Sequence, residues 1–324
     1  MNLPPLASAI TGVIGGTPMV ELHRLRKLLG LEGRLLVKLE YLNPGSSKKD
    51  RIALEMMQEA KLDPCQPVVE LTSGNTGTGL AIVCKSMGHP FIAVMSRGNT
   101  IERARMMQAL GAEVVLVDQA PGSVPNQVSG ADLALVEKRA RQLVIGRRAF
   151  RADQFHLEAN VLAHERHTGP EIREQSQGAV DVFLDYAGTG GTFTGISRYL
   201  KSKQPATRCY LVEPATAAIL AGRPVTNASH KIQGGGYGMA ELPLLDRSLV
   251  TDYLQVTDGE VIAAARMVAV EEGIFAGFST GAHLAAAIQL LRGRERGSTI
   301  AFLACDSGLK YLSTDLFPTQ IGRE

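Results

Sequence analysis

The sequence is poor in cysteine and in net charge, and each shortage excludes a class of protein. Its four cysteines show no C-x-x-C spacing of the kind that zinc or redox sites use. We therefore expect small core thiols and a reducing, cytoplasmic location. The formal net charge is only +2, which gives no reason to expect nucleic acid or an anionic membrane as a partner. The cysteines are Cys65, Cys84, Cys209 and Cys305.

Long apolar runs are also absent. No stretch approaches the roughly 18 consecutive apolar residues that would cross a bilayer. Residues 1–5 lack a basic start followed by an apolar run, so we expect no signal peptide. No internal repeat or low-complexity tract interrupts the 324 residues, a length that usually takes more than one hydrophobic core.

Short apolar runs alternate with helical patterns along most of the chain. Helical patterns include residues 100–110 and 261–272, and residues 118–130, rich in Pro, Gly, Ser and Asn, are expected to form a surface loop. Continuous apolar strands separated by helices indicate parallel sheets that are buried on both faces. The predicted fold class is therefore α/β and doubly wound. The predicted strands are residues 35–37, 68–71, 91–95, 114–117, 182–184, 210–212 and 300–303.

In open α/β sheets, ligands bind beyond the carboxyl ends of the strands, so the loops that follow strands are candidate sites. In the first such loop a turn at residues 43–45 precedes a helix, with hydroxyl residues positioned to cap it. Lys49 then lies beside the positive end of the helix dipole, a setting that favours the neutral amine, the form that condenses with a carbonyl. The alternative is that Lys48, Lys49 and Arg51 are solvated helix charges.

Three further loops have an unusual composition. Residues 71–79 carry hydroxyls, an amide and glycines before a helix at residues 80–86, which is typical of a carboxylate receptor; a plain N-capped turn is the alternative. Residues 188–192 read Gly-Thr-Gly-Gly-Thr and precede another helix, so they can wrap a phosphate. They lack the lysine of a P-loop and the spacing of a dinucleotide fingerprint. Residues 276–282 indicate only the start of a helix.

The order and spacing of these loops resemble the cysteine synthase (O-acetylserine sulfhydrylase) family of fold-type II pyridoxal-phosphate enzymes, with cystathionine β-synthase as a close relative. The resemblance implies a tryptophan synthase β-like fold of two α/β domains with mostly parallel sheets. We expect a smaller, mobile domain at residues 45–148 and a larger domain at residues 1–44 plus 149–324, which carries the phosphate cradle. The supporting motifs lie at residues 15–20, 101–103, 154–155, 164–172, 230–234 and 306–314.

The resemblance also implies a role for individual residues. Lys49 occupies the family's Schiff-base position and would shuttle the Cα proton, Asn75 would bond the cofactor's 3′ oxygen, and Ser279 would meet the pyridine nitrogen. A neutral hydroxyl at that nitrogen leaves the ring a weaker electron sink, which suits β-elimination. The phosphate would be held by Gly188, Thr189, Gly190, Gly191 and Thr192. The substrate would be bound by Thr72, Ser73, Thr76, Gln154 and Gly234.

The implied reaction is β-replacement through an aminoacrylate intermediate, with O-acetylserine and sulfide giving cysteine. Alternatives are a cysteine desulfhydrase or cystathionine β-synthase-like enzyme, a serine/threonine dehydratase, and a catalytically silent binding protein. The dehydratase is disfavoured because Asn75 is followed by Thr76 where those enzymes have His. The resemblance implies a homodimer and allows the C-terminal tail of serine acetyltransferase as a partner. His164 and His167 do not have the spacing of a metal pair, and no metal is expected.

The sequence departs from the family's pattern around the expected pocket. Lys48 stands where an apolar residue is usual, and Tyr186 precedes the phosphate loop where a small residue is usual. These departures leave the choice of donor and nucleophile open. Further departures are Gly16, Ser46, Leu157, Glu158, Tyr237 and Met239.

Overall fold

The computed structural model describes residues 6–124, 128–227 and 230–317. The signal-peptide prediction for residues 1–5, and part of the loop prediction for residues 118–130, fall outside these ranges. The strands are β1 (Met19–Glu21), β2 (Arg34–Lys38), β3 (Val68–Leu71), β4 (Phe91–Ser96), β5 (Glu113–Val117), β6 (Phe150–Arg151), β7 (Val182–Tyr186), β8 (Arg208–Pro214), β9 (Asp252–Val256) and β10 (Thr299–Leu303). The α-helices are α1 (His23–Leu28), α2 (Lys49–Glu59), α3 (Asn75–Met87), α4 (Ile101–Ala109), α5 (Gly130–Arg147), α6 (Ala159–Ala163), α7 (Gly169–Gln175), α8 (Gly191–Lys203), α9 (Asp258–Glu272) and α10 (Phe278–Arg292).

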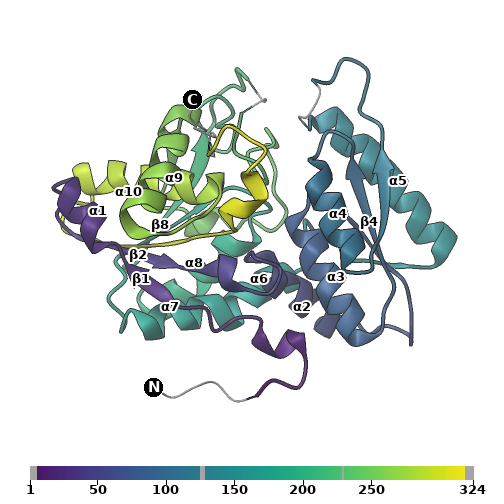
Figure 1. The fold of residues 1–324 in the computed structure, drawn as a ribbon. Helices are drawn as coiled ribbons and strands as arrows, with labels where there is room; N and C mark the ends of the chain where they lie inside the picture. Colours follow the sequence, from purple (N-terminus) through teal and green to yellow (C-terminus); the bar gives the residue numbers. More distant parts are fainter. Residues whose placement is uncertain (1–5, 125–127, 228–229, 318–324) are drawn as a thin grey trace, which may run out of the picture.

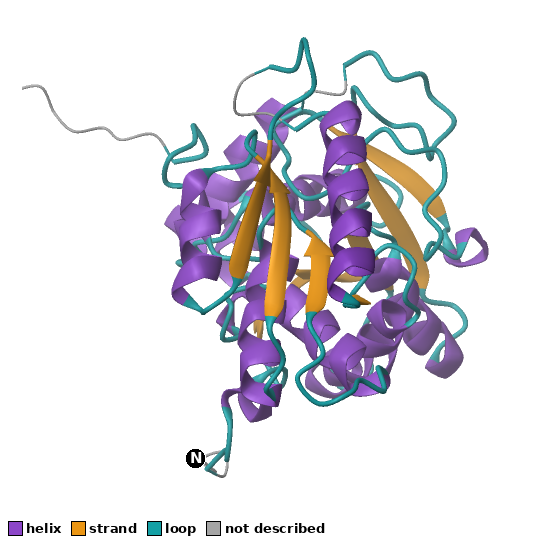
Figure 2. Cartoon of the chain, turned by 90° about the vertical axis from the view of Figure 1, so that its right-hand side faces the viewer, coloured by secondary structure: helices purple, strands orange, loops and turns teal. Residues whose placement is uncertain are grey.

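The strands form two sheets. The larger has the order β1-β2-β10-β7-β8-β9 and the smaller the order β5-β4-β3-β6. Strands pair in parallel throughout, except that β1 runs antiparallel to β2 at one edge. Figure 1 shows the two parts side by side, with α3, α4 and α5 around the smaller sheet, and Figure 2 shows helices packed around the strands of both sheets. The predicted α/β class with mostly parallel sheets is confirmed.

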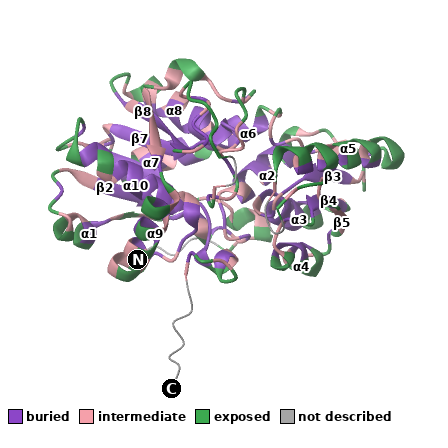
Figure 3. Cartoon of the chain, turned by 90° about the horizontal axis from the view of Figure 1, so that it is seen from above, coloured by how far each residue is buried: buried purple, intermediate pink, exposed green. Residues whose placement is uncertain are grey.

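Burial on both faces explains why the central strands read as continuous apolar runs. Successive side chains of a strand point to opposite faces, so Leu184 of β7 joins one core cluster while Phe183 joins another. In the smaller sheet Val68 and Val69 of β3 divide between two clusters in the same way. Figure 3 shows this burial along the strands, with exposed residues on the outer helices α4 and α5. Each sheet therefore has a core on both of its faces.

All seven predicted strands are present, and α4 and α9 match the predicted helices at residues 100–110 and 261–272. The helix expected at residues 80–86 begins earlier, at Asn75, because the hydroxyl-rich loop itself supplies its first turn. Strands β1, β6 and β9 were not predicted, and they are short or only half-buried. The described part of residues 118–129 forms no helix or strand, as expected of a loop. The domain boundaries stay a prediction.

Two expectations need correction. Cys65 is exposed, in a left-handed turn with φ 57°, so it is no core residue, whereas the other three cysteines are buried. The N-cap of α2 is Lys48, whose side chain makes no capping bond; instead the Ser47 hydroxyl accepts the N–H of Lys49 at 3.3 Å. Among the described residues, none of the helices is both long enough and apolar enough to span a bilayer.

Candidate active site

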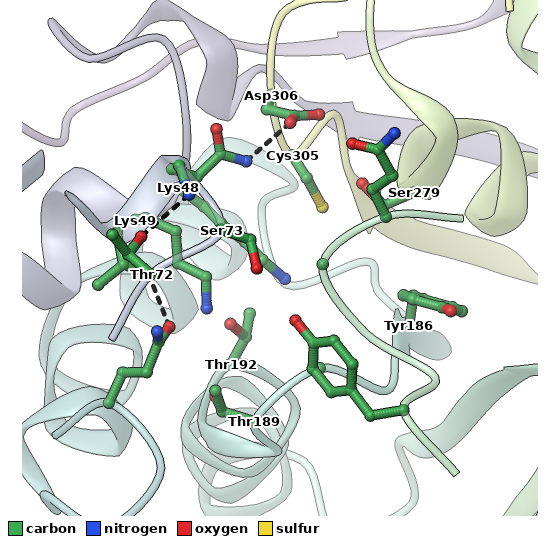
Figure 4. A pocket seen from close by; sticks show the side chains of 18 of the residues that line it. Lys48, Lys49, Thr72, Ser73, Tyr186, Thr189, Thr192, Ser279, Cys305 and Asp306 are labelled. Carbon is green, nitrogen blue, oxygen red and sulfur yellow. Dashed lines mark hydrogen bonds between the residues drawn. The ribbon is translucent and has the colours of Figure 1, made fainter. Parts of the chain in front are cut away.

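One pocket lies where loops from both sheets meet. Its empty volume is about 850 Å³, and Figure 4 shows side chains from several elements pointing into it. Of the thirteen predicted site residues only Gly191 is not in its wall. The twelve predicted residues that line it are Lys49, Thr72, Ser73, Asn75, Thr76, Gln154, Gly188, Thr189, Gly190, Thr192, Gly234 and Ser279.

Lys49 is the first residue of α2 and faces this pocket. Its pKa is lowered to about 8, first because burial disfavours the ammonium form and second because the charge of Lys48 repels a second cation. Among the described residues no carboxylate lies within 4 Å of the Lys49 Nζ atom. A lysine in this setting is an uncharged amine for a sizeable fraction of the time at neutral pH, which makes it a nucleophile and a base.

The glycine loop at residues 188–192 turns into α8. Gly190 has the left-handed backbone (φ +88°), and a Cβ there would come within 2.8 Å of the Leu245 nitrogen. Position 190 is thus closed to side chains, and the first N–H groups of the thirteen-residue helix α8 form an anion site. Asn160 supports the loop by donating to the Thr189 hydroxyl at 2.9 Å. The loop has the shape and the dipole that a phosphate requires.

His164 lies behind this loop in the π-helical segment His164–Thr168. Its Nδ1 contacts the Thr168 hydroxyl at 2.9 Å and its Nε2 the Thr192 hydroxyl at 3.1 Å. Burial lowers its pKa well below the usual value, so the ring is neutral. His164 therefore holds Thr192 in place.

The second predicted loop follows β3 and opens α3. The Thr72 hydroxyl accepts the N–H groups of Gly74 at 3.0 Å and Gly77 at 2.9 Å, which fixes the curve of the loop. Thr76 donates to the Gln154 side-chain oxygen at 2.6 Å, and Gln154 in turn donates to the Leu71 carbonyl at 3.2 Å. The hydroxyls, the amide and the start of α3 are thus fixed around one side of the pocket, as a carboxylate receptor requires.

Asn75 belongs to a network that the sequence did not predict. Its amide nitrogen donates to Asp306 at 2.7 Å, and its oxygen accepts from Lys310 at 2.7 Å. Asp306 also accepts the Tyr311 hydroxyl at 2.6 Å. Because Asp306 lies 231 residues from Asn75 in the chain, only the fold brings them together. The motif at residues 306–314 was the one signal that pointed to this segment.

A second unpredicted network surrounds Lys48. Its ammonium lies 3.0 Å from the Asp185 carboxylate at the end of β7. His283 of α10 lies 3.3 Å from the same carboxylate, and its Nε2 accepts the Tyr186 N–H at 2.7 Å. The Cys305 sulfur lies 4.0 Å from the same histidine ring. Cys305 is thus a buried thiol, as predicted, but it also forms part of the pocket wall.

Arg103 brings a positive charge to the outer end of the pocket. Its guanidinium donates to the Ser73 carbonyl at 2.7 Å and to the Gln233 side chain at 2.6 Å. The residue is only 4% exposed, and no described carboxylate lies within 4 Å of its nitrogens. Tyr237 and Phe155, with ring centroids 6.2 Å apart, lie beside it in the wall. A buried cation without a carboxylate favours an anionic ligand.

Comparison with known proteins agrees with this geometry. The family model described as "Pyridoxal-phosphate dependent enzyme" matches residues 10–306. The chain belongs to this family. Its cofactor is accordingly pyridoxal phosphate, and the predicted cofactor is confirmed.

Individual relatives narrow the reaction class of this pyridoxal-phosphate enzyme. Cysteine synthase 3 of Caenorhabditis elegans is 40% identical over 310 residues, which cover 94% of this chain and 88% of that protein. The crystal structure of an O-ureido-L-serine synthase is 36% identical, with a TM-score of 0.86 over 97% of this chain and 96% of that one. A hydrogen sulfide-producing enzyme from Fusobacterium nucleatum is 35% identical, with a TM-score of 0.86 over 95% of this chain and all of that one. The chain is a cysteine synthase-like enzyme, as the sequence motifs predicted.

Proposed function

We propose that this enzyme transfers a nucleophile to the β-carbon of a β-substituted L-alanine, with O-acetylserine and sulfide giving cysteine and acetate. The observation that carries the proposal is that Lys49, the hydroxyl loop at residues 72–76 and the glycine loop at residues 188–192 face one pocket. These three parts supply an amine, a carboxylate receptor and a phosphate site, which such a reaction needs together.

The pocket suits pyridoxal phosphate in shape and in donors. We assign the phosphate to residues 188–192, the 3′ oxygen to Asn75 and the pyridine nitrogen to Ser279, at the start of α10. A side chain at position 190 would collide with Leu245, whereas a phosphate would meet the N-terminus of α8. The cofactor supplies an electron sink for the negative charge that develops at the substrate's Cα.

Lys49 would hold the cofactor covalently and then act as the base. Its pKa of about 8 lets it take the Cα proton and give it back near neutral pH. Thr72, Ser73, Thr76 and Gln154 would bind the substrate carboxylate, and Arg103 would add a fixed positive charge beyond Ser73. We place the departing β-substituent toward Gly234, where a Cβ would meet no atom within 4 Å.

The second candidate function is the release of sulfide from cysteine. It would use the same residues, and the Fusobacterium neighbour is described as hydrogen sulfide-producing. The bulky Tyr186 and Tyr237 in the pocket wall favour a donor or nucleophile different from that of typical cysteine synthases. Three expectations stay predictions under either function: a homodimer, the C-terminal tail of serine acetyltransferase as a partner, and a cytoplasmic location.

A substrate panel tests the proposal. O-acetylserine, O-phosphoserine, serine, cysteine and threonine would each be incubated with and without sulfide, and the products identified by mass spectrometry. We expect cysteine from O-acetylserine only when sulfide is present, and its loss in Lys49→Ala. The exposed Lys61→Ala is the matched control and should keep full turnover.

The other outcomes separate the alternatives. Sulfide from cysteine, without synthesis from O-acetylserine, would establish the second candidate function. Keto acid from serine or threonine, with no reaction of O-acetylserine, would move the enzyme to the dehydratases. No turnover of any substrate by protein that carries the cofactor would identify a binding protein.

A further inference from the structure

Two neighbouring lysines enter one pocket, and only one of them has a carboxylate. The Lys48 ammonium lies 3.0 Å from Asp185, and the two side chains are 12% and 3% exposed. The backbone N–H of Lys48 donates to the Cys305 carbonyl at 2.8 Å, which fixes the direction of its side chain. Lys49 lines the same pocket without an ion pair to any described residue. The ion pair is therefore the feature that distinguishes the surroundings of Lys48 from those of Lys49.

Asp185 is itself held so that Lys48 is its cation. His283 lies 3.3 Å away, but its Nε2 accepts the Tyr186 N–H at 2.7 Å and its Nδ1 contacts the Leu303 carbonyl at 2.8 Å. A backbone N–H can only donate, so Nε2 carries no proton while it accepts the Tyr186 N–H, and the proton of the ring is on Nδ1. Although burial disfavours the charged ring, Cys305 and Asp185 raise the pKa of His283 to about 9, so charging the ring would require this hydrogen bond to break. His283 fixes the end of β7, and Lys48 is the cation that pairs with Asp185.

The cost of burying charge in this pocket depends on how many cations and carboxylates it holds. Two buried ammonium groups beside one carboxylate leave one cation uncompensated, which is costly. Although burial disfavours its charged form, Asp185 raises the pKa of Lys48, while burial and Lys48 lower the pKa of Lys49 to about 8. Other titratable groups near the two lysines and Asp185 are Cys305, Glu70, His164 and His283.

We propose that Lys48 and Asp185 are a positioning pair that keeps a reactive fraction of Lys49 in the uncharged amine form. The salt bridge occupies the carboxylate, so Lys49 keeps the lone pair with which its nitrogen attacks the aldehyde carbon of pyridoxal phosphate, and a C=N bond forms as water leaves. This inference rests on the proposed role of Lys49. It also explains why a lysine stands at position 48, where an apolar residue is usual: with an apolar residue there, Asp185 would be left to pair with Lys49.

Substitutions of Lys48 and Asp185 can distinguish a positioning role from a merely structural salt bridge, because the two hypotheses predict different results. In Lys48→Met the carboxylate of Asp185 loses its lysine partner, and Lys49 is the lysine that remains in the pocket, so the pKa of Lys49 should rise. A rise from about 8 to the ordinary 10.5 lowers the uncharged fraction at neutral pH by on the order of a hundredfold. Lys48→Met/Asp185→Asn removes both charges, so Lys49 should regain a low pKa from burial alone. A structural bridge predicts no such rescue.

The readout is the rate at which the full-length protein, stripped of cofactor, attaches added pyridoxal phosphate covalently, followed by absorbance across a pH series. We expect Lys48→Met to be about a hundredfold slower at neutral pH and to recover as the pH rises. Lys48→Arg and the double variant should stay within a few-fold of the parent. A parental pH profile in Lys48→Met, or a double variant as slow as the single one, would overturn the proposal.

Two further measurements keep the result interpretable. Amine labelling of the stripped parent protein across pH, read by mass spectrometry, should modify Lys49 before Lys48, and the reverse order overturns the proposal even if Lys48→Met does not fold. Borohydride reduction and peptide mapping of the holoenzyme identify the lysine that carries the cofactor. A lysine other than Lys49 would refute its proposed role and this inference together, whereas a failed rescue refutes the inference alone.

Discussion

Gly190 offers the sharpest test of the phosphate loop, because the structure separates two costs of adding a side chain there. The first is backbone strain: at φ +88° an alanine costs roughly 1–2 kcal/mol more than glycine. The second is collision: the new Cβ would lie 2.8 Å from the Leu245 nitrogen and 2.9 Å from its Cβ. Since one of those atoms is backbone, the loop itself must move, and overpacking of this kind typically costs about 1–3 kcal/mol.

Gly111 provides the matched control. It has the same φ of +88°, but a Cβ there would meet no atom within 4 Å, and it lies outside the pocket. Gly111→Ala should therefore lose about 1–2 kcal/mol of unfolding free energy and bind the cofactor normally. Gly190→Ala should lose stability and, in addition, bind pyridoxal phosphate roughly 5- to 150-fold more weakly, the equivalent of about 1–3 kcal/mol.

The assay combines urea unfolding of the cofactor-free variants with equilibrium dialysis against graded pyridoxal phosphate. Gly190→Val should bind still more weakly, because a β-branched residue tolerates positive φ less well than alanine. If Gly190→Ala lost stability as Gly111→Ala does but bound the cofactor like the parent, the loop at residues 188–192 would not be the phosphate site.

Three other predictions follow from particular contacts. Glu171 is partly buried, which raises its pKa, but hydrogen bonds from Arg51 lower it to about 2, so its stabilising effect is present above pH ~4.5 and lost as the pH falls toward 2. Glu171→Gln should be less stable at pH 7 by urea unfolding and should lose less stability between pH 7 and pH 3. Thiol titration of the native protein should show one fast group, Cys65, and three slow ones, and Cys65→Ser should abolish only the fast phase. Light scattering at micromolar concentration should give a dimer mass, and a mass near 34.6 kDa would contradict the predicted homodimer.

The fold could be predicted because each central strand has a local pattern of apolar residues that is visible in the sequence. Strands such as β3, β7 and β10 are buried at every residue, so each reads as a mostly apolar run, with one acid in β3 (Glu70) and one in β7 (Asp185). Strand β9 is half-buried at four of its five residues and β6 has only two residues, so neither produces such a run. Their places in the sheets come from pairing with β8 and β3, which a local pattern does not record.

The residues of the candidate site likewise include some that the sequence predicted and some that it could not predict. The hydroxyl loop, the glycine loop and Lys49 could be found because each has an unusual local composition directly after a strand. Asp185 and His283 could not, because a single acid within an apolar strand and a single histidine within a helix have no local pattern. Their importance arises from contacts with residues 137 and 97 positions away, Lys48 and Tyr186 respectively. Lys48 was recognised as unusual, but its partner requires the fold.

The distribution of carboxylates in the pocket explains how so polar a site can keep a reactive amine. Each acid near the centre is already engaged: Asp185 with Lys48, Asp306 with Asn75 and Tyr311, and Glu70 with Arg151 at 2.9 Å. Within the described parts of the chain, neither Lys49 nor Arg103 has a carboxylate within 4 Å. Burial, and after it the charge of Lys48, therefore favours the amine form of Lys49, while Arg103 keeps a positive charge for an entering anion. An amino acid would thus bring the carboxylate that both residues lack, and the fixed charge of Arg103 beside the Ser73 carbonyl would attract that carboxylate.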